Sequence, residues 1–298
     1  MTAQSRRVAR GVEGSEEKGK VMNIEIKEME ERRAKIIVSN TTPSIVNLLR
    51  RAMIADVPKM AIEDVEFHLG PIRDEHGNEY ESAAPLFDEI IAHRLGLVPI
   101  PTDLNLFTFR DQCSCGGVGC PQCTIIYSLS KKGPCTVYSG DLEPVGDPSL
   151  APVDKNIPIV KLGEGQALLI YAIAVLGRGK EHAKWQAAQA VGYKYYPEIN
   201  IDTKLCDLCM ECAQSCPVNI LKSDGKKIIV EDNEKCTLCN TCVEVCAPNA
   251  IKVIGRDDKF ILTYETDGAL KAYDVLIYAL RILRDRFSEI EKSLDSIK

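Results

Sequence analysis

The chain has 298 residues, of which 45% are hydrophobic and 27% are charged, and its formal net charge is −6. This length is sufficient for two or three domains with cores of their own. The acidic balance excludes a protein that coats nucleic acid by itself, because such a protein needs clustered positive charge. Any contact with DNA is therefore expected to be indirect at most.

The sequence predicts neither a membrane span nor export. The longest apolar run, Ala167 to Leu176, is about half of the ~20 residues that a spanning helix needs. The amino-terminal segment has no apolar stretch of the signal-peptide type. The thirteen cysteines cluster at metal-ligand spacings in a long chain. A cytoplasmic metal-binding protein is therefore expected rather than a secreted protein held by disulfides.

The first elements follow a charged amino-terminal segment. Residues 1–21 are polar and have almost nothing to bury, so we expect a disordered tail, and Met22 is an alternative start of translation. Alternating apolar residues predict a strand from Met22 to Ile26, and a second strand covers Ala34 to Val38. Thr42 is expected to cap a helix that has Pro43 at its first position. This helix should end before Pro58, and its apolar side consists of Ile45, Leu48, Leu49, Ala52 and Met53.

The middle of the chain has weaker signals. Val65, Phe67 and Leu69 alternate with polar residues and predict a third strand. A short helix over Leu86–Leu95 should be closed by Gly96 in a left-handed conformation. Residues 103–158 are expected to be loop-rich, and Ala167–Leu176 is expected to be a buried strand. The turn Gly177–Gly179, with Arg178 and Lys180, is interpreted as a solvated loop.

The last helix is the clearest element. It follows an alternating strand at Phe260, Leu262 and Tyr264. Apolar residues then recur at spacings of three and four over three heptads: Tyr273, Leu276, Leu280, Leu283, Phe287, Ile290 and Leu294. Two interpretations are open, a core helix that packs on its own sheet and a helix that also packs against a partner chain.

Strand and helix patterns lie on both sides of the cysteine-rich middle. The simplest arrangement is an α+β fold in which one domain is built from the two chain ends, with other domains inserted between them. The expected boundaries give a discontinuous domain at residues 22–70 and 256–298, a mixed α/β inserted domain at 71–197, and a cysteine-rich domain at 198–255.

Eight cysteines occur in two copies of one spacing. Cys206, Cys209, Cys212 and Cys216 form Cys-x-x-Cys-x-x-Cys-x-x-x-Cys, and Cys236, Cys239, Cys242 and Cys246 repeat it. The offset is 30 residues, as 236 minus 206 shows. Other residues also match at this offset, so the block is an internal duplication: Asp202 and Asp232, Leu208 and Leu238, Asn219 and Asn249, Lys222 and Lys252.

This spacing is typical of ferredoxin-like proteins with two [4Fe–4S] clusters. Three thiolates on a tight loop hold three irons of one cube, and the fourth cysteine ligates the other cluster. We therefore assign Cys206, Cys209, Cys212 and Cys246 to one cluster, and Cys236, Cys239, Cys242 and Cys216 to the other. Zinc also uses Cys-x-x-Cys pairs, but it does not need a third cysteine at the same interval. Whether one cluster has the [3Fe–4S] form stays open.

A second cysteine group precedes this block. Cys113, Cys115, Cys120 and Cys123 lie within eleven residues, and the glycines between them allow sharp turns. Four thiolates suit a structural tetrahedral Zn²⁺, while a disulfide or a metal-free group of thiols is the alternative. Cys135 is left over and is expected to be a buried, unreactive thiol.

The sequence contains no recognisable catalytic motif. It has no phosphate-binding glycine loop, no nucleophile elbow and no zincin motif, and the four histidines have no partners nearby in the sequence. No catalytic residue is therefore assigned. The cysteine block alone would also fit a ferredoxin-type electron-transfer subunit of an oxidoreductase, although the rest of the chain offers no flavin, nucleotide or quinone site.

Three further segments carry a family resemblance. Residues 41–70 resemble the first helix and following strand of the alpha-type assembly subunits of cellular RNA polymerases. The segment Asp88–Pro101, which contains Glu-Ile-Ile-Ala-His-Arg-Leu-Gly-Leu-Val-Pro-Ile-Pro, resembles the next element, and Ala174–Trp185 resembles a third. The resemblance covers about residues 22–298 and is strongest to the archaeal branch of this family.

This resemblance implies a function and partners. The family has a dimerisation domain made from both chain ends, an inserted domain and, in some archaea, a ferredoxin-like domain. It implies a non-catalytic assembly platform within a nucleotidyltransferase complex, in which the clusters stabilise or regulate the platform. Cys113–Cys123 resembles the zinc loop of the eukaryotic relative, with one extra residue between the second and third cysteine.

The implied partners are subunit L, the small subunits N and P, and the large catalytic subunits. Subunit L would form a heterodimer with this chain through the terminal helix. The interface residues expected on that basis are Ile45, Leu48, Leu49, Tyr273, Leu276, Leu280, Leu283, Phe287 and Ile290.

Overall fold

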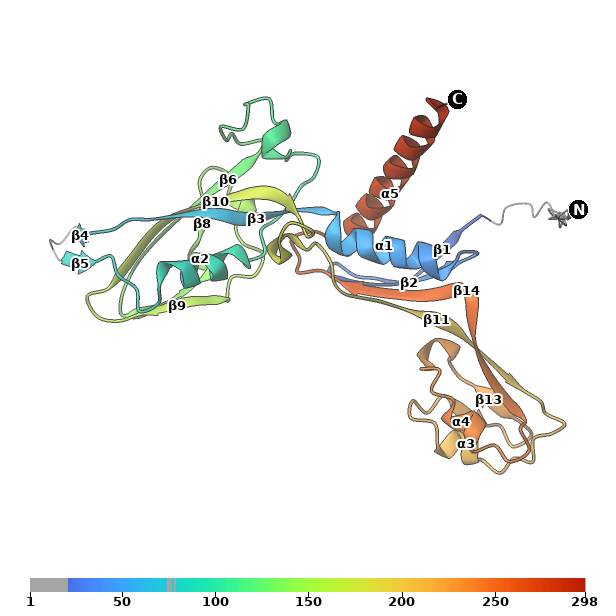
Figure 1. The fold of residues 1–298 in the computed structure, drawn as a ribbon. Helices are drawn as coiled ribbons and strands as arrows, with labels where there is room; N and C mark the ends of the chain where they lie inside the picture. Colours follow the sequence, from blue (N-terminus) through green and yellow to red (C-terminus); the bar gives the residue numbers. More distant parts are fainter. Residues whose placement is uncertain (1–20, 74–76, 78, 298) are drawn as a thin grey trace, which may run out of the picture.

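The computed structural model describes residues 21–73, 77 and 79–297. The tail expected at residues 1–21 therefore lies outside the described part, apart from Val21. Figure 1 shows two sheets side by side and a small cysteine-rich block below the sheet that contains β2, β11 and β14, so the mixed α+β class is confirmed. No helix in the described part is long and apolar enough to cross a membrane.

The first sheet joins both ends of the chain. Its order is β1-β2-β14-β11, and every neighbouring pair is antiparallel. The strands are β1 (Asn23–Met29), β2 (Arg33–Ser39), β11 (Gln189–Ile201) and β14 (Ile251–Glu265). The prediction that one domain is built from the two chain ends is thus confirmed for this sheet.

Two helices, α1 (Pro43–Ala55) and α5 (Ala272–Asp295), cover one face of the first sheet. Thr42 has extended backbone angles and Pro43 opens α1, as the sequence predicts. Alternate residues of β2 and β14 point toward these helices and are buried with them: Ala34, Ile36, Val38, Phe260, Leu262 and Tyr264. The Tyr264 hydroxyl donates to the carbonyl of Ala272 at 2.8 Å, which fixes the start of α5.

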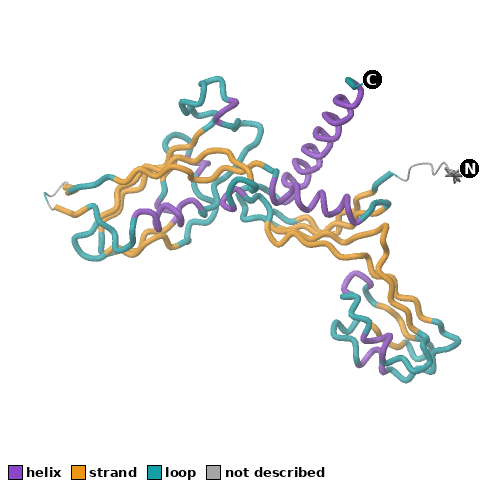
Figure 2. The backbone as a smooth tube through the Cα atoms, in the orientation of Figure 1, coloured by secondary structure: helices purple, strands orange, loops and turns teal. Residues whose placement is uncertain are grey.

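Helix α5 has two halves with different surroundings. Its first half packs into the core, where Val275, Leu276, Ala279 and Leu283 are buried. Arg286 then forms two hydrogen bonds of 2.7 and 2.6 Å with Asp56, at the end of α1. Beyond this ion pair the helix projects alone from the body, as Figure 2 shows. Four residues of the predicted stripe are exposed by 52–58%: Tyr273, Phe287, Ile290 and Leu294.

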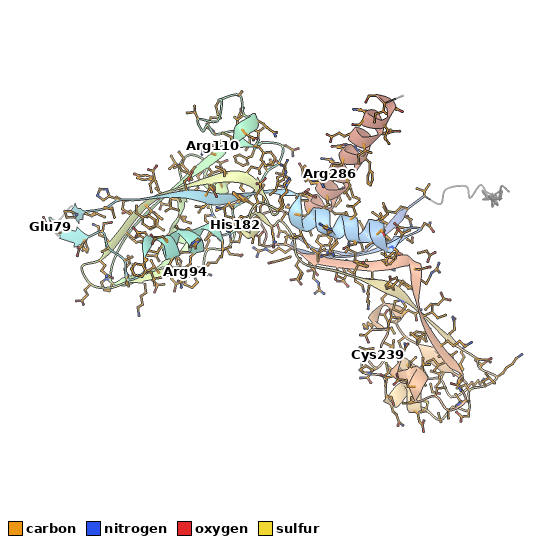
Figure 3. The ribbon with its side chains drawn as sticks, viewed as in Figure 1. Glu79, Arg94, Arg110, His182, Cys239 and Arg286 are labelled. Carbon is orange, nitrogen blue, oxygen red and sulfur yellow. The ribbon has the colours of Figure 1, made fainter. Side chains whose placement is uncertain are left out.

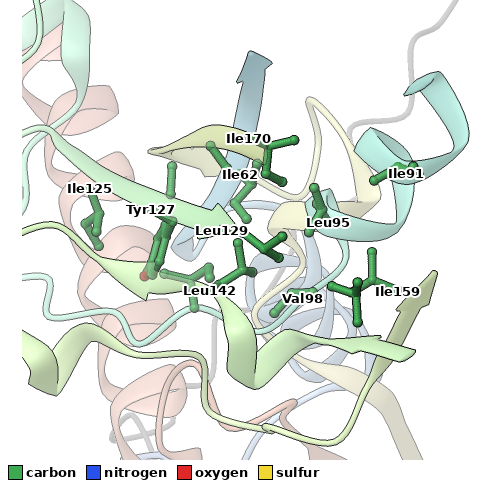
Figure 4. Close-up of a cluster of buried hydrophobic side chains, with 14 of the residues drawn as sticks. Ile62, Ile91, Leu95, Val98, Ile125, Tyr127, Leu129, Leu142, Ile159 and Ile170 are labelled. Atoms are coloured by element: carbon green, nitrogen blue, oxygen red, sulfur yellow. The ribbon is translucent and has the colours of Figure 1, made fainter. Parts of the chain in front are cut away.

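The second sheet has the order β3-β10-β6-β8 and is also antiparallel. Its strands are β3 (Pro58–Phe67), β10 (Ala167–Arg178), β6 (Thr124–Lys132) and β8 (Glu143–Pro144). Helix α2 (Asp88–Gly96) and the pair β7 (Cys135–Tyr138) with β9 (Pro158–Leu162) cover it. Figure 4 shows the core between them, with Ile91 and Leu95 of α2 facing Ile62, Leu129 and Ile170. A hairpin of β4 (Pro71–Arg73) and β5 (Glu79–Glu81) extends one end.

Some predicted elements differ from the observed ones. The stretch 103–158 is loop-rich as expected, but it also contains β6, an unpredicted strand whose Ile125, Tyr127 and Leu129 are buried at alternate positions. Strand β3 begins at Pro58 and ends at Phe67, so Leu69 lies outside it and is 76% exposed. The length of β11 has no counterpart among the predicted elements.

The sheets also divide the chain differently from the expected boundaries. Strand β3 precedes the expected boundary at residue 70, yet it pairs with β10 in the second sheet. Most of β11 precedes the boundary at residue 197, yet β11 pairs with β14 in the first sheet. Sequence spacing alone does not show which partner such a strand will choose, because the partners are far away in the chain.

Two glycine predictions are wrong. Gly96 is the last residue of α2, and the following cap at Leu97 is right-handed with φ −92°. A Cβ at Gly96 would lie 3.4 Å from the carbonyl oxygen of Ile62, so the end of α2 lies in contact with β3. The Gly177–Gly179 turn is not a solvated loop, since a Cβ at Gly177 would overlap the Trp185 ring and one at Gly179 would overlap the Ile54 carbonyl.

Gly177→Ala should destabilise the protein by ~1–3 kcal/mol or more, because the added methyl group must displace the buried Trp185 ring. Gly192→Ala is the matched control, since it lies in β11 with nothing within 4 Å of the added Cβ. Its effect should stay within ~1 kcal/mol. Thermal unfolding of both variants measures the difference, and equal melting temperatures would contradict the packing argument.

Candidate metal centres

The eight-cysteine block lies at the far end of a two-stranded ribbon. Strands β11 and β14 continue beyond the first sheet and pair as far as Ile201 and Ile251. The N–H of Asp202 then donates to the carbonyl of Ala250 at 2.8 Å, which closes the block at its base. Figure 3 shows Cys239 within this block, on the side of the first sheet that faces away from α1 and α5.

The backbone repeats the duplication that the sequence shows. Non-glycine residues with positive φ occur as pairs thirty positions apart: Leu208 (60°) and Leu238 (59°), Met210 (68°) and Asn240 (61°), Asn219 (52°) and Asn249 (53°). Each copy also has a one-turn helix, α3 (Glu211–Gln214) or α4 (Thr241–Glu244). Left-handed leucines are strained by roughly 1–2 kcal/mol each. Strain at the same place in both cysteine loops indicates that the loops must hold a special shape.

The first group of sulfurs surrounds Cys212. The charges that act on its thiol come from Cys206, Cys209 and Cys246, which are the other cysteines assigned to the first cluster. Burial raises the pKa of Cys212, and these neighbouring thiolates raise it further. Cys209 is exposed, whereas Cys212 is buried.

The second group surrounds Cys242 in the same manner. Burial raises the pKa of its thiol to about 11, and the charges of Cys216, Cys236 and Cys239 add to the rise. Repulsion from these neighbouring charges favours protonation of Cys242, so a bound cation would be needed to keep its thiol ionised at neutral pH. Two N–H···S hydrogen bonds orient sulfur atoms of the block, from Leu238 to Cys236 at 3.4 Å and from Ala250 to Cys246 at 3.2 Å.

The block has little else to hold it together. Its buried residues are four cysteines and only five aliphatic residues: Cys212, Cys216, Cys236, Cys242, Ile220, Leu221, Ile228, Ala250 and Ile251. A short hairpin of β12 (Leu221–Ser223) and β13 (Ile228–Val230) carries two of the aliphatic residues. So small an apolar core cannot by itself offset the entropy of ordering the block. The donor set, the paired loops and the small core all fit metal clusters.

The other cysteine group has the geometry of a tetrahedral metal site. The sulfur atoms of Cys113, Cys115, Cys120 and Cys123 all lie within 4.8 Å of one another. The distance is 3.5 Å between Cys113 and Cys120, 3.7 Å between Cys115 and Cys123, and 3.9 Å between Cys120 and Cys123. Zn–S bonds of about 2.3 Å place the sulfurs of a tetrahedron roughly 3.8 Å apart. These four residues could therefore hold Zn²⁺.

The loop that carries this group is held by backbone turns and by one arginine. Gly116, Gly117 and Gly119 have φ of 68°, 84° and 106°, in agreement with the sharp turns expected of them. The role of Arg110 has no signal in the sequence. Its side chain donates to the carbonyls of Gly117 at 2.9 Å and Val118 at 3.3 Å, across the loop (Figure 3).

The four thiols of this group differ in acidity. A hydrogen bond from the backbone N–H of Cys115 lowers the pKa of Cys113 to about 6. Burial raises the pKa of Cys123 to about 12. A metal ion would therefore displace a proton from Cys123 on binding, and the hydrogen bond from the Cys120 N–H to its sulfur at 3.3 Å favours the resulting thiolate. Cys135 lies apart, in β7 beside the second core.

The expected interface residues fall into two sets. Leu49, Leu276 and Leu283 are buried in the chain's own core and are not available to a partner. Leu48 and Leu280 are partly buried against the same core. The remaining expected residues are exposed: Ile45, Tyr273, Phe287 and Ile290. Leu294 and Ile297 extend this exposed set along α5 and beyond its end, so the projecting half of the helix carries a row of exposed apolar side chains.

Comparison with known families agrees with these sites. A model described as the RNA polymerase Rpb3/RpoA insert domain matches residues 74–204, and one described as a 4Fe-4S dicluster domain matches residues 198–247. The chain therefore has an iron–sulfur domain that contains the duplicated cysteine block. The first match includes the loop that carries Cys113–Cys123, and both matches end within the cysteine block.

Full-length relatives extend the match to the whole chain. The protein of Thermoplasma volcanium named DNA-directed RNA polymerase subunit Rpo3 is 46% identical over 92% of this chain and 99% of its own length. Relatives of the same name in Picrophilus torridus and Archaeoglobus fulgidus are 44% and 41% identical, over 91% and 92% of this chain and 99% and 98% of their own lengths. These names offer no support for the electron-transfer alternative. At this identity and coverage, the chain belongs to the Rpo3 family of DNA-directed RNA polymerase subunits.

Proposed function

We propose that the protein is a non-catalytic assembly platform of DNA-dependent RNA polymerase in the cytoplasm. The observation that carries this proposal is the exposed apolar half of α5, which is anchored to the first sheet at one end and free at the other. A surface that is built rigidly and left uncovered is typical of a subunit interface. Because the chain belongs to the Rpo3 family, the proposed assembly is DNA-directed RNA polymerase.

Subunit L is the proposed partner of this surface. Burial of one Phe, Leu or Ile side chain contributes roughly 1.5–3 kcal/mol. The exposed set on α5, Phe287, Ile290 and Leu294, is therefore large enough to drive a stable heterodimer. In this proposal the heterodimer binds subunits N and P and the large catalytic subunits, and DNA is contacted only through them.

The iron–sulfur domain is proposed to hold two [4Fe–4S] clusters with a structural role. Cys206, Cys209, Cys212 and Cys246 would hold one, and Cys236, Cys239, Cys242 and Cys216 the other. The main support is that four of the block's nine buried residues are cysteines, so the metal must supply the stability that the apolar core lacks. The Cys113–Cys123 group is proposed to hold one structural Zn²⁺, because its sulfur distances match a tetrahedral site.

Phe287→Asp combined with Ile290→Asp should abolish co-purification of the chain with subunit L. Both side chains are exposed and outside the core, so the monomer should keep its melting temperature. The pair is better suited than Leu283, whose substitution would also damage the core. The measurement is the yield of heterodimer on size-exclusion chromatography after co-expression.

The control for this pair is Leu69→Asp, which places the same charge on an exposed leucine beside the β4–β5 hairpin. It should leave the heterodimer yield unchanged. Normal pairing of the Phe287→Asp and Ile290→Asp variant would rule out α5 as the interface.

Chain purified without oxygen should contain about eight irons and about eight inorganic sulfides, as two cubes require. Removal of the clusters by air or chelator should unfold residues 202–250, because the block has only five buried aliphatic residues. Iron analysis and protease digestion test this. A colourless, iron-poor chain whose block resists protease would contradict the cluster proposal.

Cys120→Ser should lower the zinc content from about one ion per chain to nearly none, because three thiolates leave the tetrahedral site incomplete. Cys135→Ser is the matched control, since it removes a thiol from the same domain that is outside the group of four. Elemental analysis after dialysis measures both. Retention of a full zinc ion by the Cys120→Ser chain would show that these cysteines do not form the site.

A further inference from the structure

The two copies of the cysteine repeat differ in how they meet the first sheet. Glu234 lies two residues before Cys236, in the short 3₁₀ helix η5 (Asn233–Lys235) of the second copy. Lys204 takes the equivalent place in the first copy, carries the opposite charge and is exposed. In the described part of the chain, the hydrogen bonds of residues 203–216 all stay within the first copy and its base.

Glu234 joins the second copy to the edge of the first sheet. Its carboxylate lies 2.7 Å from the Lys35 ammonium on β2 and 3.3 Å from the Lys27 ammonium on β1. The Glu234 side chain is only 15% exposed, so solvent screens these ion pairs less than surface pairs. One carboxylate thus links two neighbouring strands, one of which is the edge strand.

A third lysine forms hydrogen bonds with the backbone of the same segment. The Lys194 ammonium, on β11, donates to the carbonyl of Glu234 at 2.6 Å and to that of Cys236 at 2.9 Å. Cys236 is itself a proposed cluster ligand, so this contact reaches the metal-binding loop directly. The Leu238 side chain adds an apolar contact, since a Cβ built at Gly255 of β14 would lie 3.2 Å from its Cδ1 atom.

These contacts lie on the face of the sheet that α1 and α5 do not cover. Lys194, Ile261 and Ile37 are neighbours across β11, β14 and β2, so their side chains point to the same face. That face is opposite to the one that carries Val38 and Phe260 into the helical core. Ile37 and Ile261 are nevertheless only 2% exposed each. The contacts of Glu234 with Lys35 and Lys194 hold η5 against this face.

We propose that the cluster of the second copy, but not that of the first, stabilises the β1–β2 edge of the first sheet through Glu234 and Lys194. This inference rests on the proposed clusters. When the second loop loses its cluster, Cys236 is released and η5 no longer lies on the sheet, so the contacts of Glu234 with Lys27 and Lys35 and those of Lys194 are lost. The edge strand β1, which pairs only with β2, then opens more often.

Hydrogen exchange of the full chain purified without oxygen tests the coupling. Cys242→Ser should raise the exchange rates of β2 amides and of the β1 amides paired with them by roughly tenfold, because charged hydrogen bonds to the sheet are lost. Cys212→Ser, the matched change in the first copy, should leave those amides at the wild-type rate. Equal acceleration by both variants, or by neither, would overturn the proposal.

A second pair of variants leaves every cysteine in place. Glu234→Gln should accelerate exchange in β1 and β2 while the iron content stays at the wild-type value, and Lys204→Gln should do neither. The charge reversal Glu234→Lys with Lys35→Glu should recover much of the protection. Wild-type exchange in an iron-replete Glu234→Gln chain would refute this coupling alone, whereas a wild-type chain without iron would refute the clusters themselves.

Discussion

The pairing of β11 with β14 is the constraint on which both the first sheet and the iron–sulfur domain depend. One antiparallel ribbon serves both parts. Lys194 pairs with Ile261 inside the sheet, and Ile201 pairs with Ile251 at the base of the cysteine block. Between these points the register shifts, from Tyr195 opposite Phe260 to Tyr196 opposite Arg256.

The extra residues at this shift form the corner where the ribbon leaves the sheet. Strand β2 pairs with β14 only from Lys259 to Glu265, so the sheet ends at the corner. The Lys259 ammonium lies 3.8 Å from the centre of the Tyr196 ring, and Arg256 forms two hydrogen bonds with Asp258 of 2.9 and 2.8 Å. The bulge, which these contacts stabilise, thus changes the direction of the ribbon. As a result the block lies beneath the first sheet.

The features that can be predicted from the sequence are those whose physical cause is local. The cysteine spacing reflects how closely consecutive thiolates must approach one cube, and the start of α1 reflects the properties of Thr42 and Pro43. Apolar residues occupy every second position from Tyr193 to Ile201, so β11 has a local strand signal, although Pro197 within the run weakens it. The pairing of β11 has no such signal, because its partner residues on β14 lie 50 to 76 positions away. The prediction for Gly96 is wrong because Gly96 is itself the last residue of α2, and a glycine in this place has the same sequence signature as one in a left-handed cap.

Which residues of α5 are buried also cannot be predicted from the sequence. Leu283 and Phe287 belong to one apolar stripe with regular spacing, and nothing in their sequence distinguishes them. The structure buries Leu283 and exposes Phe287, because the core ends near the Arg286–Asp56 ion pair. The sequence therefore identified the surface chemistry of the helix, whereas the length of the sheet decided which part of it is free for a partner.

Connectivity alone would make the platform insensitive to its metal clusters. If the block were unfolded, the residues between Ile201 and Ile251 would form a long loop between two strands of one sheet. The entropy cost of closing such a loop rises by only about 0.6 kcal/mol for each doubling of its length. The pairing of Lys194 with Ile261 would therefore survive, and only a direct contact can transmit the state of the block. The contacts of Glu234 and Lys194 provide that route, and they do so from one of the two cysteine loops.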